Sequence, residues 1–484
     1  MMEQYTNQFI NGQWKTGSSD KTIEDYNPFS GESIVTIQSA DKEDLEEAFQ
    51  AAKKAQIKWR DTTPAEKQIL FDKLINVMQQ QRDDIVDWLI KESGSTRLKA
   101  NAEFDASVGI IKESASFPTR MAGAILPSNF PNKENRVYRL PKGVIGVIGP
   151  WNFPLHLTMR SVAPALATGN SVVIKPASDT PVTSGLLIGK LFQDAGFPDG
   201  LVNVVVGRGS EIGDEFVIHP IPKLISFTGS TEVGQRIGEQ AGKHLKDVAL
   251  ELGGNNAMVV LKDANIERAA KAAVFGKFFH QGQICMALNR MIVEKEVYDA
   301  FVEEFVRLVR GLKVGDPSDE ATLVGPVINK AQVERIQKDL QESVEQGAEI
   351  LVGGEADGCL MQPVVLAHVT NGMPIAKNEI FGPVASIIKA ENEEDALQIA
   401  NDSPYGLSGS IFTEDRHHGV ELALKIETGM IHINDQSVND EPHVPFGGEK
   451  ESGIGRFNGE WAIEKFTTVK WIGIQSGYRE YPFF

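Results

Sequence analysis

Apolar residues recur at helical spacing through the first quarter of the chain, over about residues 42–117. Two series have members three or four positions apart: Leu70, Leu74, Val77 and Met78, then Ile85, Trp88 and Leu89. This period gathers apolar side chains on one face of a helix. We therefore expect long helices here, preceded by short strands at about 9–12 and 32–37.

A different pattern begins at residue 143, where short apolar runs alternate with segments of helical spacing. Strands are expected at 144–148, 171–174, 202–206, 224–227 and 248–250, and helices near 157–168, 182–195 and 232–241. Strands that alternate with helices of this length form a parallel sheet with helices on both faces.

A second series follows Gly254. Strands are expected at 257–261, 291–294 and 350–352, and helices at 266–279, 297–312 and 329–347. The chain is therefore predicted to form two α/β units joined near residue 251.

Two further segments depart from both series. Segment 123–141 contains Pro127, Pro131 and Pro141 and has no helical period, which indicates an excursion or hairpin arm. The tail 466–484 carries Val469 and Trp471 at strand spacing. We expect the tail to be an edge strand that pairs with 123–141.

Composition limits the partners and the compartment. The 484 residues are 41% hydrophobic and 24% charged, and the net charge of -18 disfavours binding to nucleic acid or to an anionic membrane. Two cysteines fit a reducing compartment, and the N-terminus has no signal-peptide pattern. The most apolar segment, 143–157, is interrupted by prolines and polar residues and is unsuited to span a membrane. We expect a cytoplasmic protein that binds no metal.

Cys285 is the first candidate for chemistry. It lies in a loop beside glycine and amide residues, and a thiolate is the best side-chain nucleophile. A free cysteine is also a common core residue, so the thiol by itself leaves both interpretations open. Glu251, 34 residues upstream, ends an apolar run before two glycines, where it either caps a turn or acts as a base.

Other candidates lie where the predicted strands end. Asn152 follows the first βα strand, where its amide either shapes a turn or donates to an oxyanion. Gly229 and Ser230 stand at a strand-to-helix turn, a position that favours phosphate. Lys175 closes the second strand and either faces a cofactor ribose or lies on the surface. The glycines of 143–149 do not fit the dinucleotide fingerprint.

Taken together, these motifs resemble the NAD(P)-dependent aldehyde dehydrogenase family over nearly the whole chain. The matching segments are Pro150–Pro154, Lys175–Pro176, Phe227–Thr231, Glu251–Gly254, Gly282–Cys285, Glu379–Pro383 and Pro445–Gly448. The resemblance implies an α/β fold with three parts. A Rossmann-type dinucleotide-binding domain covers 1–122 and 142–251, a catalytic domain covers 252–465, and a small β oligomerisation arm covers 123–141 and 466–484.

The resemblance also implies roles for individual residues. Cys285 is the expected nucleophile, Glu251 the general base, and Asn152 the oxyanion donor beside the backbone N–H of Cys285. Six residues are expected to bind the cofactor, which is NAD or NADP: Lys175, Gly229, Ser230, Glu379, Phe381 and Trp151. A small-molecule aldehyde is the expected substrate, and a homodimer or homotetramer the expected assembly.

Some residues depart from the general family pattern. Ser178 stands where strictly NAD-dependent members often have Glu, so we add Ser178 to the cofactor site and expect NADP to be accepted as well as NAD. Ser161 replaces a frequent lysine, and the stretch 431–443 is unusual. With Ile284–Met286, these last features resemble the benzaldehyde and vanillin dehydrogenase branch.

An aromatic aldehyde is therefore the expected substrate, with a pocket formed by Phe153, Met159, Met286 and Val438. Aliphatic aldehydes and succinate semialdehyde stay open as alternatives, and Arg160 is a conceivable partner for the distal carboxylate of the second. A CoA-acylating enzyme is disfavoured because Glu251 is present. A non-catalytic, crystallin-like protein would need none of Cys285, Glu251 and Asn152.

Overall fold

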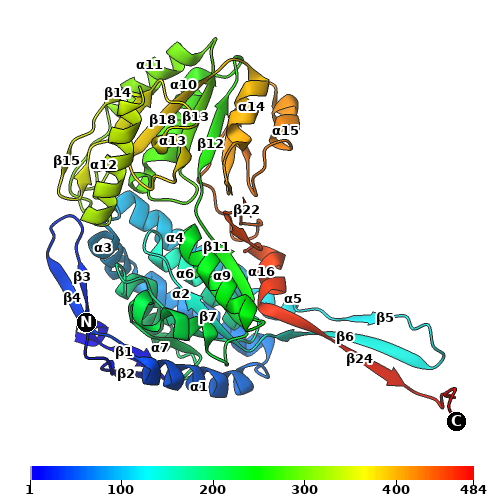
Figure 1. Ribbon diagram of the computed structural model, residues 1–484. Helices are drawn as coiled ribbons and strands as arrows, with labels where there is room; N and C mark the ends of the chain where they lie inside the picture. The colour runs from blue at the N-terminus through cyan, green and yellow to red at the C-terminus, as the bar shows by residue number, and fades with distance from the viewer. Residues whose placement is uncertain (1–2) are drawn as a thin grey trace.

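The computed structural model describes residues 3–484 and shows two α/β lobes, one above the other, with a β arm that extends from the lower lobe (Figure 1). This architecture confirms the predicted fold class. Among residues 3–484, no helix is long and apolar enough to cross a membrane.

The lower lobe is built on an eight-stranded sheet whose central strands are parallel. In spatial order its strands are β2 (Gln13–Lys15), β1 (Gln8–Ile10), β9 (Val202–Val204), β8 (Ser171–Lys175), β7 (Val144–Ile148), β10 (Leu224–Thr228), β11 (Asp247–Glu251) and β23 (Gly453–Ile454). Alternate residues of β7 pack on opposite faces, since Ile145 and Val147 join one apolar cluster and Val144 joins another. Both faces are therefore covered, as predicted.

The predicted helices of this lobe are present. They are α1 (Lys42–Trp59), α2 (Pro64–Gln80), α3 (Arg82–Ser93), α4 (Arg97–Ala115), α6 (Pro154–Ala167), α7 (Leu187–Asp194) and α9 (Thr231–Lys243). Two of them differ in detail from the prediction. Helix α6 starts at Pro154, and the expected helix 182–195 opens with a π-helical turn, Val182–Leu186, before α7. The buried carboxylate of Glu92 accepts from the backbone N–H groups of Val182 and Thr183 at this turn.

The upper lobe carries a seven-stranded sheet that is mostly parallel. Its strands, in order, are β14 (Glu349–Val352), β17 (Val364–Ala367), β18 (Val384–Ala390), β13 (Leu288–Glu294), β12 (Asn256–Val260), β20 (Gly409–Phe412) and β21 (His432–Ile433). Helices α10 (Ile266–Phe278), α11 (Tyr298–Val309), α12 (Lys330–Glu345), α14 (Glu393–Asn401) and α15 (Arg416–Ala423) surround it. The catalytic thiol candidate lies just before β13.

The arm is a three-stranded sheet in the order β24 (Thr467–Gln475), β6 (Lys133–Pro141) and β5 (Ala124–Leu126). Strand β24 pairs with β6 along its whole length, from Thr467 opposite Pro141 to Gln475 opposite Lys133. The predicted pairing of the tail with segment 123–141 is therefore confirmed, and the arm projects from the body beside helix α5 (Phe117–Arg120) (Figure 1).

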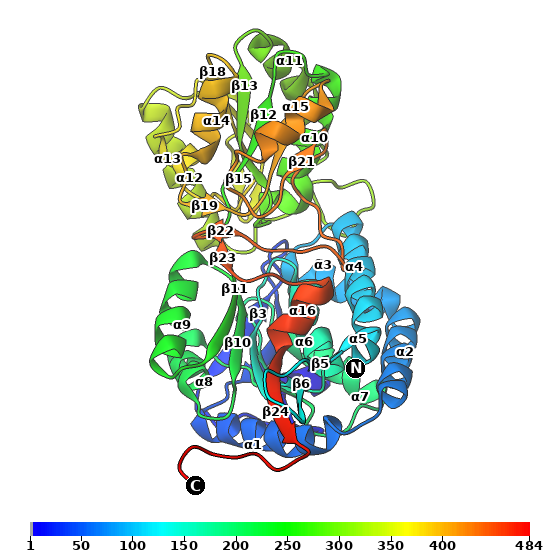
Figure 2. The same ribbon diagram turned by 90° about the vertical axis from the view of Figure 1, so that its right-hand side faces the viewer.

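The domain limits stay a prediction, and the C-terminal part of the chain bears on them. Strand β23 pairs antiparallel with β11 of the lower sheet, through Gly453 opposite Glu251. Helix α16 (Gly459–Phe466) follows and also lies on the lower lobe (Figure 2). The chain thus returns to the lower lobe before residue 465, the expected end of the upper domain.

Candidate active site

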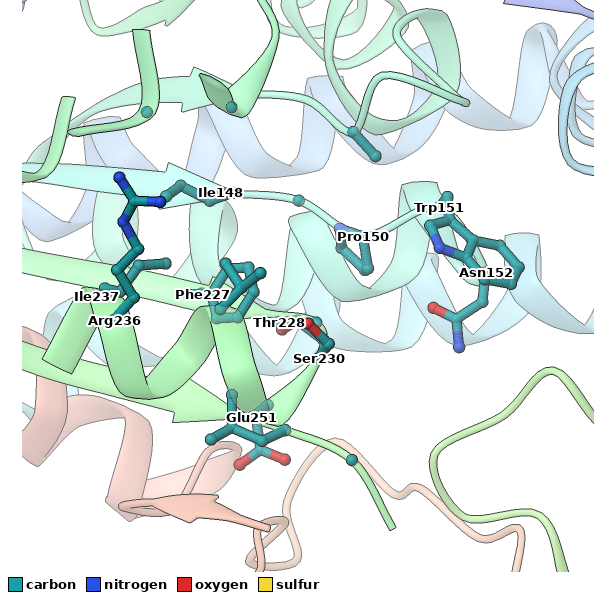
Figure 3. Close-up of a pocket in the computed structure, with 18 of the residues that line it drawn as sticks. Ile148, Pro150, Trp151, Asn152, Phe227, Thr228, Ser230, Arg236, Ile237 and Glu251 are labelled. Carbon is teal, nitrogen blue, oxygen red and sulfur yellow. The ribbon is translucent and has the colours of Figure 1, made fainter. Parts of the chain in front are cut away.

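A cavity of about 730 Å³ opens at the carboxyl ends of β7, β8, β10 and β11, where the upper lobe faces them. Nine of the predicted site residues line it: Trp151, Asn152, Lys175, Gly229, Ser230, Glu251, Cys285, Glu379 and Phe381. Figure 3 shows Trp151 and Asn152 at one end of this space and Arg236 at the other, with Ser230 and Glu251 between them. Ligands of parallel α/β sheets bind at this edge.

The loop of Cys285 has an unusual backbone. His280, Gln281 and Gly282 all have positive φ, at 49°, 57° and 73°. A side chain at Gly282 would come within 2.3 Å of the Gly382 carbonyl, so the close approach requires glycine. The loop then turns directly into β13, whose first residue is Leu288.

Side chains from three other segments hold this loop. Asn256 Nδ2 donates to the Cys285 carbonyl over 2.7 Å, and Ser437 Oγ donates to the Met286 carbonyl over 2.6 Å. Asn152 Nδ2 donates to the Gln283 carbonyl over 2.9 Å. The predicted oxyanion amide and the predicted nucleophile are therefore brought together.

Burial dominates the ionisation of the thiol. Cys285 is half-buried, and loss of solvation raises the pKa of its thiol to about 12. The guanidinium of Arg160 lowers this pKa, and the carboxylates of Glu251, Glu379 and Asp440 raise it. This raised pKa favours the neutral thiol, and Arg160 favours its ionisation.

Glu251 ends β11 and is 2% exposed. Neither carboxylate oxygen has a hydrogen-bond partner among the described residues. Burial raises the pKa of this carboxyl to about 8; Arg160 opposes the shift, and Asp440 adds to it. A carboxyl whose pKa lies close to neutral is suited to general acid–base work.

Arg160 belongs to a buried polar cluster beside these two residues. Its Nη1 donates to Asp440 Oδ2 over 3.2 Å, and Asp440 also contacts His156 Nε2 at 2.8 Å and accepts from Asn458 Nδ2 over 2.7 Å. The guanidinium lies 4.0 Å from the Phe446 ring centroid. Its Nε and Nη2 have no partner among the described residues.

The polar lining of the remaining cavity fits a dinucleotide. Helix α9 begins after Ser230, whose side chain makes no capping hydrogen bond, so the first N–H groups of the helix can bind a phosphate. Lys175 lies at the end of β8, where burial lowers the pKa of its amine to about 8. Glu379 Oε1 accepts from the Gly254 N–H over 2.8 Å, and burial raises the pKa of Glu379 to about 7.

An aromatic contact links the two lobes at this cavity. The rings of Trp151, from the lower lobe, and Phe381, from the upper lobe, meet edge to face with centroids 5.3 Å apart. Phe381 has a φ of 52°, and Gln332 Nε2 on α12 donates to its carbonyl over 3.0 Å.

The other predicted residues lie outside the cavity lining. Ser178 is half-buried, one residue beyond Ala177, which does line the cavity. Met159 is fully buried, and Met286 is 7% exposed. Both belong to the apolar cluster against which Phe153, Val438 and Cys285 pack.

Sequence patterns missed several residues that line or support the cavity. Arg236 lines it from α9 and pairs with Asp214 over 2.5 Å, and Arg335 lines it from α12 and donates to the carbonyls of the Glu379 loop. Each is one arginine on a polar helical face, without a local motif to mark it.

Comparison with known proteins assigns the chain to a family. Residues 14–472 match the aldehyde dehydrogenase family, and the chain belongs to it. It is 54% identical to a vanillin dehydrogenase of Corynebacterium glutamicum (97% of this chain and 98% of the relative) and 49% identical to a benzaldehyde dehydrogenase of Bacillus subtilis (99% of each). The structure of an NAD-dependent benzaldehyde dehydrogenase from Corynebacterium glutamicum superposes with a TM-score of 0.90 at 50% identity, covering 97% of this chain and 98% of that one.

Proposed function

We propose that this protein oxidises an aromatic aldehyde to the carboxylic acid with NAD or NADP, through intermediates bound to Cys285. The observation that carries the proposal is that Asn152, Glu251 and Cys285 line one cavity whose remaining residues fit a dinucleotide. The relatives named above are vanillin and benzaldehyde dehydrogenases, which supports the aromatic substrate class.

The first step is attack of Cys285 sulfur on the aldehyde carbon. The thiol proton passes to the carboxylate of Glu251, and the positive charge of Arg160 favours the thiolate over the thiol. The carbonyl oxygen becomes an oxyanion that accepts from Asn152 Nδ2 and the backbone N–H of Cys285. Such donors are effective because they are already oriented before the charge develops.

The chemistry that an oxidised nicotinamide supplies when bound is acceptance of a hydride from the carbon of this adduct, which leaves a thioester on Cys285. Glu251 releases the thiol proton to solvent and, ionised again, removes a proton from water; the resulting hydroxide attacks the thioester carbon, and the sulfur leaves as a thiolate. A pKa of about 8 gives Glu251 basicity without leaving it fully protonated at neutral pH.

We assign the cofactor residues by their places around the cavity. Gly229 and Ser230, at the start of α9, would hold the pyrophosphate. Lys175, with Ser178 beyond it, would face the adenosine ribose. Glu379 would bind the nicotinamide ribose, and Phe381, packed against Trp151, would contact the nicotinamide ring.

We propose that Phe153, Met159, Met286 and Val438 form the substrate side. All four lie outside the cavity lining, in or against the apolar core on which Cys285 also packs, and their apolar side chains suit an aromatic ring. Steady-state kcat/KM for benzaldehyde, vanillin, hexanal and succinate semialdehyde, each with NAD and NADP, tests the proposal. We expect both aromatic aldehydes to exceed hexanal by at least about tenfold. A preference for hexanal or succinate semialdehyde would overturn the substrate class.

We also infer that the arm joins copies of this chain into a homo-oligomer. Trp471 and Ile125 on the arm are 65% and 71% exposed, and the arm extends away from the body (Figure 1). Exposed apolar side chains on a projecting sheet favour burial against a partner.

The two unpaired cysteines support a cytoplasmic setting.

A further inference from the structure

Helix α4 carries two charged side chains that are fully buried. Lys99 and Glu103 lie one helical turn apart, both with 0% exposure, and Lys99 Nζ lies 2.5 Å from Glu103 Oε2. Helix α4 packs beside α6 on the lower lobe (Figure 1).

Lys99 holds the carbonyl of the candidate oxyanion residue. Its ammonium group donates to the Asn152 carbonyl over 2.6 Å and to Ser95 Oγ over 2.9 Å. With Glu103 as the third acceptor, all three N–H donors of the ammonium are used. The backbone of Asn152 is thereby fixed relative to α4.

Glu103 holds the other side of the same turn. Its Oε1 accepts from the backbone N–H groups of Leu155 and His156, over 2.9 and 3.2 Å. Helix α6 has no side-chain cap of its own, so Glu103 supplies one from another helix, where a carboxylate also complements the helix dipole. The pair therefore hydrogen-bonds to the backbone of the turn on both sides of Phe153.

The contacts continue to the loop of the thiol. Lys99 Nζ lies 4.1 Å from the Phe153 ring centroid, and that ring meets the His280 ring edge to face at 5.5 Å. His280 begins the left-handed run that leads to Cys285. One buried pair thus contacts both the Asn152 turn and the aromatic residue that packs on the Cys285 loop.

Stability alone does not explain two ions in this place. Apolar residues of similar volume often replace a buried ion pair without loss of stability, whereas breaking the pair is costly. The charges provide direction here, since the bond from Lys99 to the Asn152 carbonyl and the two backbone N–H bonds accepted by Glu103 fix atoms of the Asn152 turn. We propose that Lys99 and Glu103 are positioning residues that aim the Asn152 amide at the reacting carbonyl oxygen. This inference rests on the proposed function.

A double-mutant cycle tests the coupling. The paired substitution Lys99→Met with Glu103→Leu leaves no unpaired charge, and it is made both in the otherwise unchanged chain and in the Asn152→Ala background. In the otherwise unchanged chain, we expect the paired substitution to lower kcat about 10- to 100-fold and to change KM for NAD less than about twofold. A misplaced Asn152 amide lowers the rate of reaction rather than the binding of the cofactor. In the Asn152→Ala background, kcat should change less than about twofold.

The controls separate positioning from general damage. Lys67→Met removes another buried lysine, which donates to the Thr62 carbonyl over 2.6 Å, and should leave kcat unchanged. Lys99→Arg keeps a cation with N–H donors and should retain more kcat than the paired substitution, so the proposal stays testable if the apolar pair fails to fold. Equal losses in both backgrounds, or a Lys99→Arg enzyme as slow as the paired Lys99→Met, Glu103→Leu variant, would overturn the inference alone. Wild-type kcat in Asn152→Ala would overturn the oxyanion role in the proposed function, and this inference with it.

Discussion

The side-chain amide of Asn152 donates to the backbone carbonyl of Gln283 over 2.9 Å, two residues before Cys285. This hydrogen bond joins the end of β7 in the lower lobe to the thiol loop that leads into the upper lobe. An amide nitrogen carries two N–H donors, so one is left for an oxygen bound in the cavity that Asn152 lines. The hydrogen bond thus fixes the position of the oxyanion donor relative to the loop that carries the nucleophile.

The two cysteines offer a matched test of the nucleophile. Cys285→Ala should lower kcat by about 10³-fold or more, because no other thiol lines the described cavity. Cys359, also half-buried but outside the cavity lining, should tolerate the same change with kcat unchanged. Steady-state assays of both variants check this, and a Cys285→Ala enzyme with wild-type kcat would refute covalent catalysis.

The raised pKa of Glu251 predicts how the rate depends on pH. A base must be ionised to act, and burial raises the pKa of Glu251 to about 8. The fraction ionised, and with it kcat, should therefore rise as pH increases from 6 to 9, with a midpoint near 8. Glu251→Gln keeps the shape of the side chain and should be slow at every pH. A wild-type profile that is flat over this range would contradict the role of Glu251.

The order of helices and strands could be predicted because each part of the chain has a clear period. The βα alternation after residue 143 and the pairing of the tail with 123–141 both appear in the structure. Helix α6 starts at Pro154, about three residues before the predicted position, and its cap, Glu103, comes from a helix about fifty residues earlier. A local pattern contains no information about a cap supplied in this way.

Local sequence patterns also predicted only part of the candidate site. Cys285, Glu251 and Asn152 stand in motifs and line one cavity. The pair Lys99 and Glu103 fits the i, i+4 pattern of a solvated helix surface, and only the packing of α4 against α6 shows that both are buried. Asp440 likewise becomes a partner of Arg160 only through the fold.

Arg160 should make the thiol more reactive. Its guanidinium lowers the pKa of Cys285, so Arg160→Met should raise that pKa and slow alkylation by iodoacetamide at pH 8. A loss of about tenfold corresponds to one pKa unit. Arg120→Met is a suitable control, since Arg120 also lies over a ring, that of Phe117, and pairs with Glu113. Equal alkylation rates in Arg160→Met and the wild type would show that Arg160 has no such effect.

Ser178 should govern acceptance of the 2′-phosphate. Ser178→Glu places a carboxylate near the expected adenosine ribose, where it repels a phosphate and can accept from ribose hydroxyls. We expect kcat/KM for NADP to fall by at least about tenfold, with that for NAD changed less than about threefold. Ser178→Ala, which adds no charge, should leave the ratio of kcat/KM for NADP to kcat/KM for NAD close to that of the wild type. If Ser178→Glu leaves the ratio unchanged, then the cofactor's ribose lies elsewhere.

The arm should hold the assembly together through its apolar side chains. Val469 and Trp471 lie two residues apart on β24, hence on one face of the arm, and are 64% and 65% exposed. Trp471→Asp would bury a charge in any contact made by this face, which costs far more than it costs on an exposed surface. We expect light scattering to show a multimer for the wild type and a smaller species for Trp471→Asp. Leu424→Asp changes a side chain that is 84% exposed on the other lobe and should leave the mass unchanged. A wild-type monomer, or a Trp471→Asp multimer of wild-type mass, would show that this face of the arm does not assemble copies of the chain.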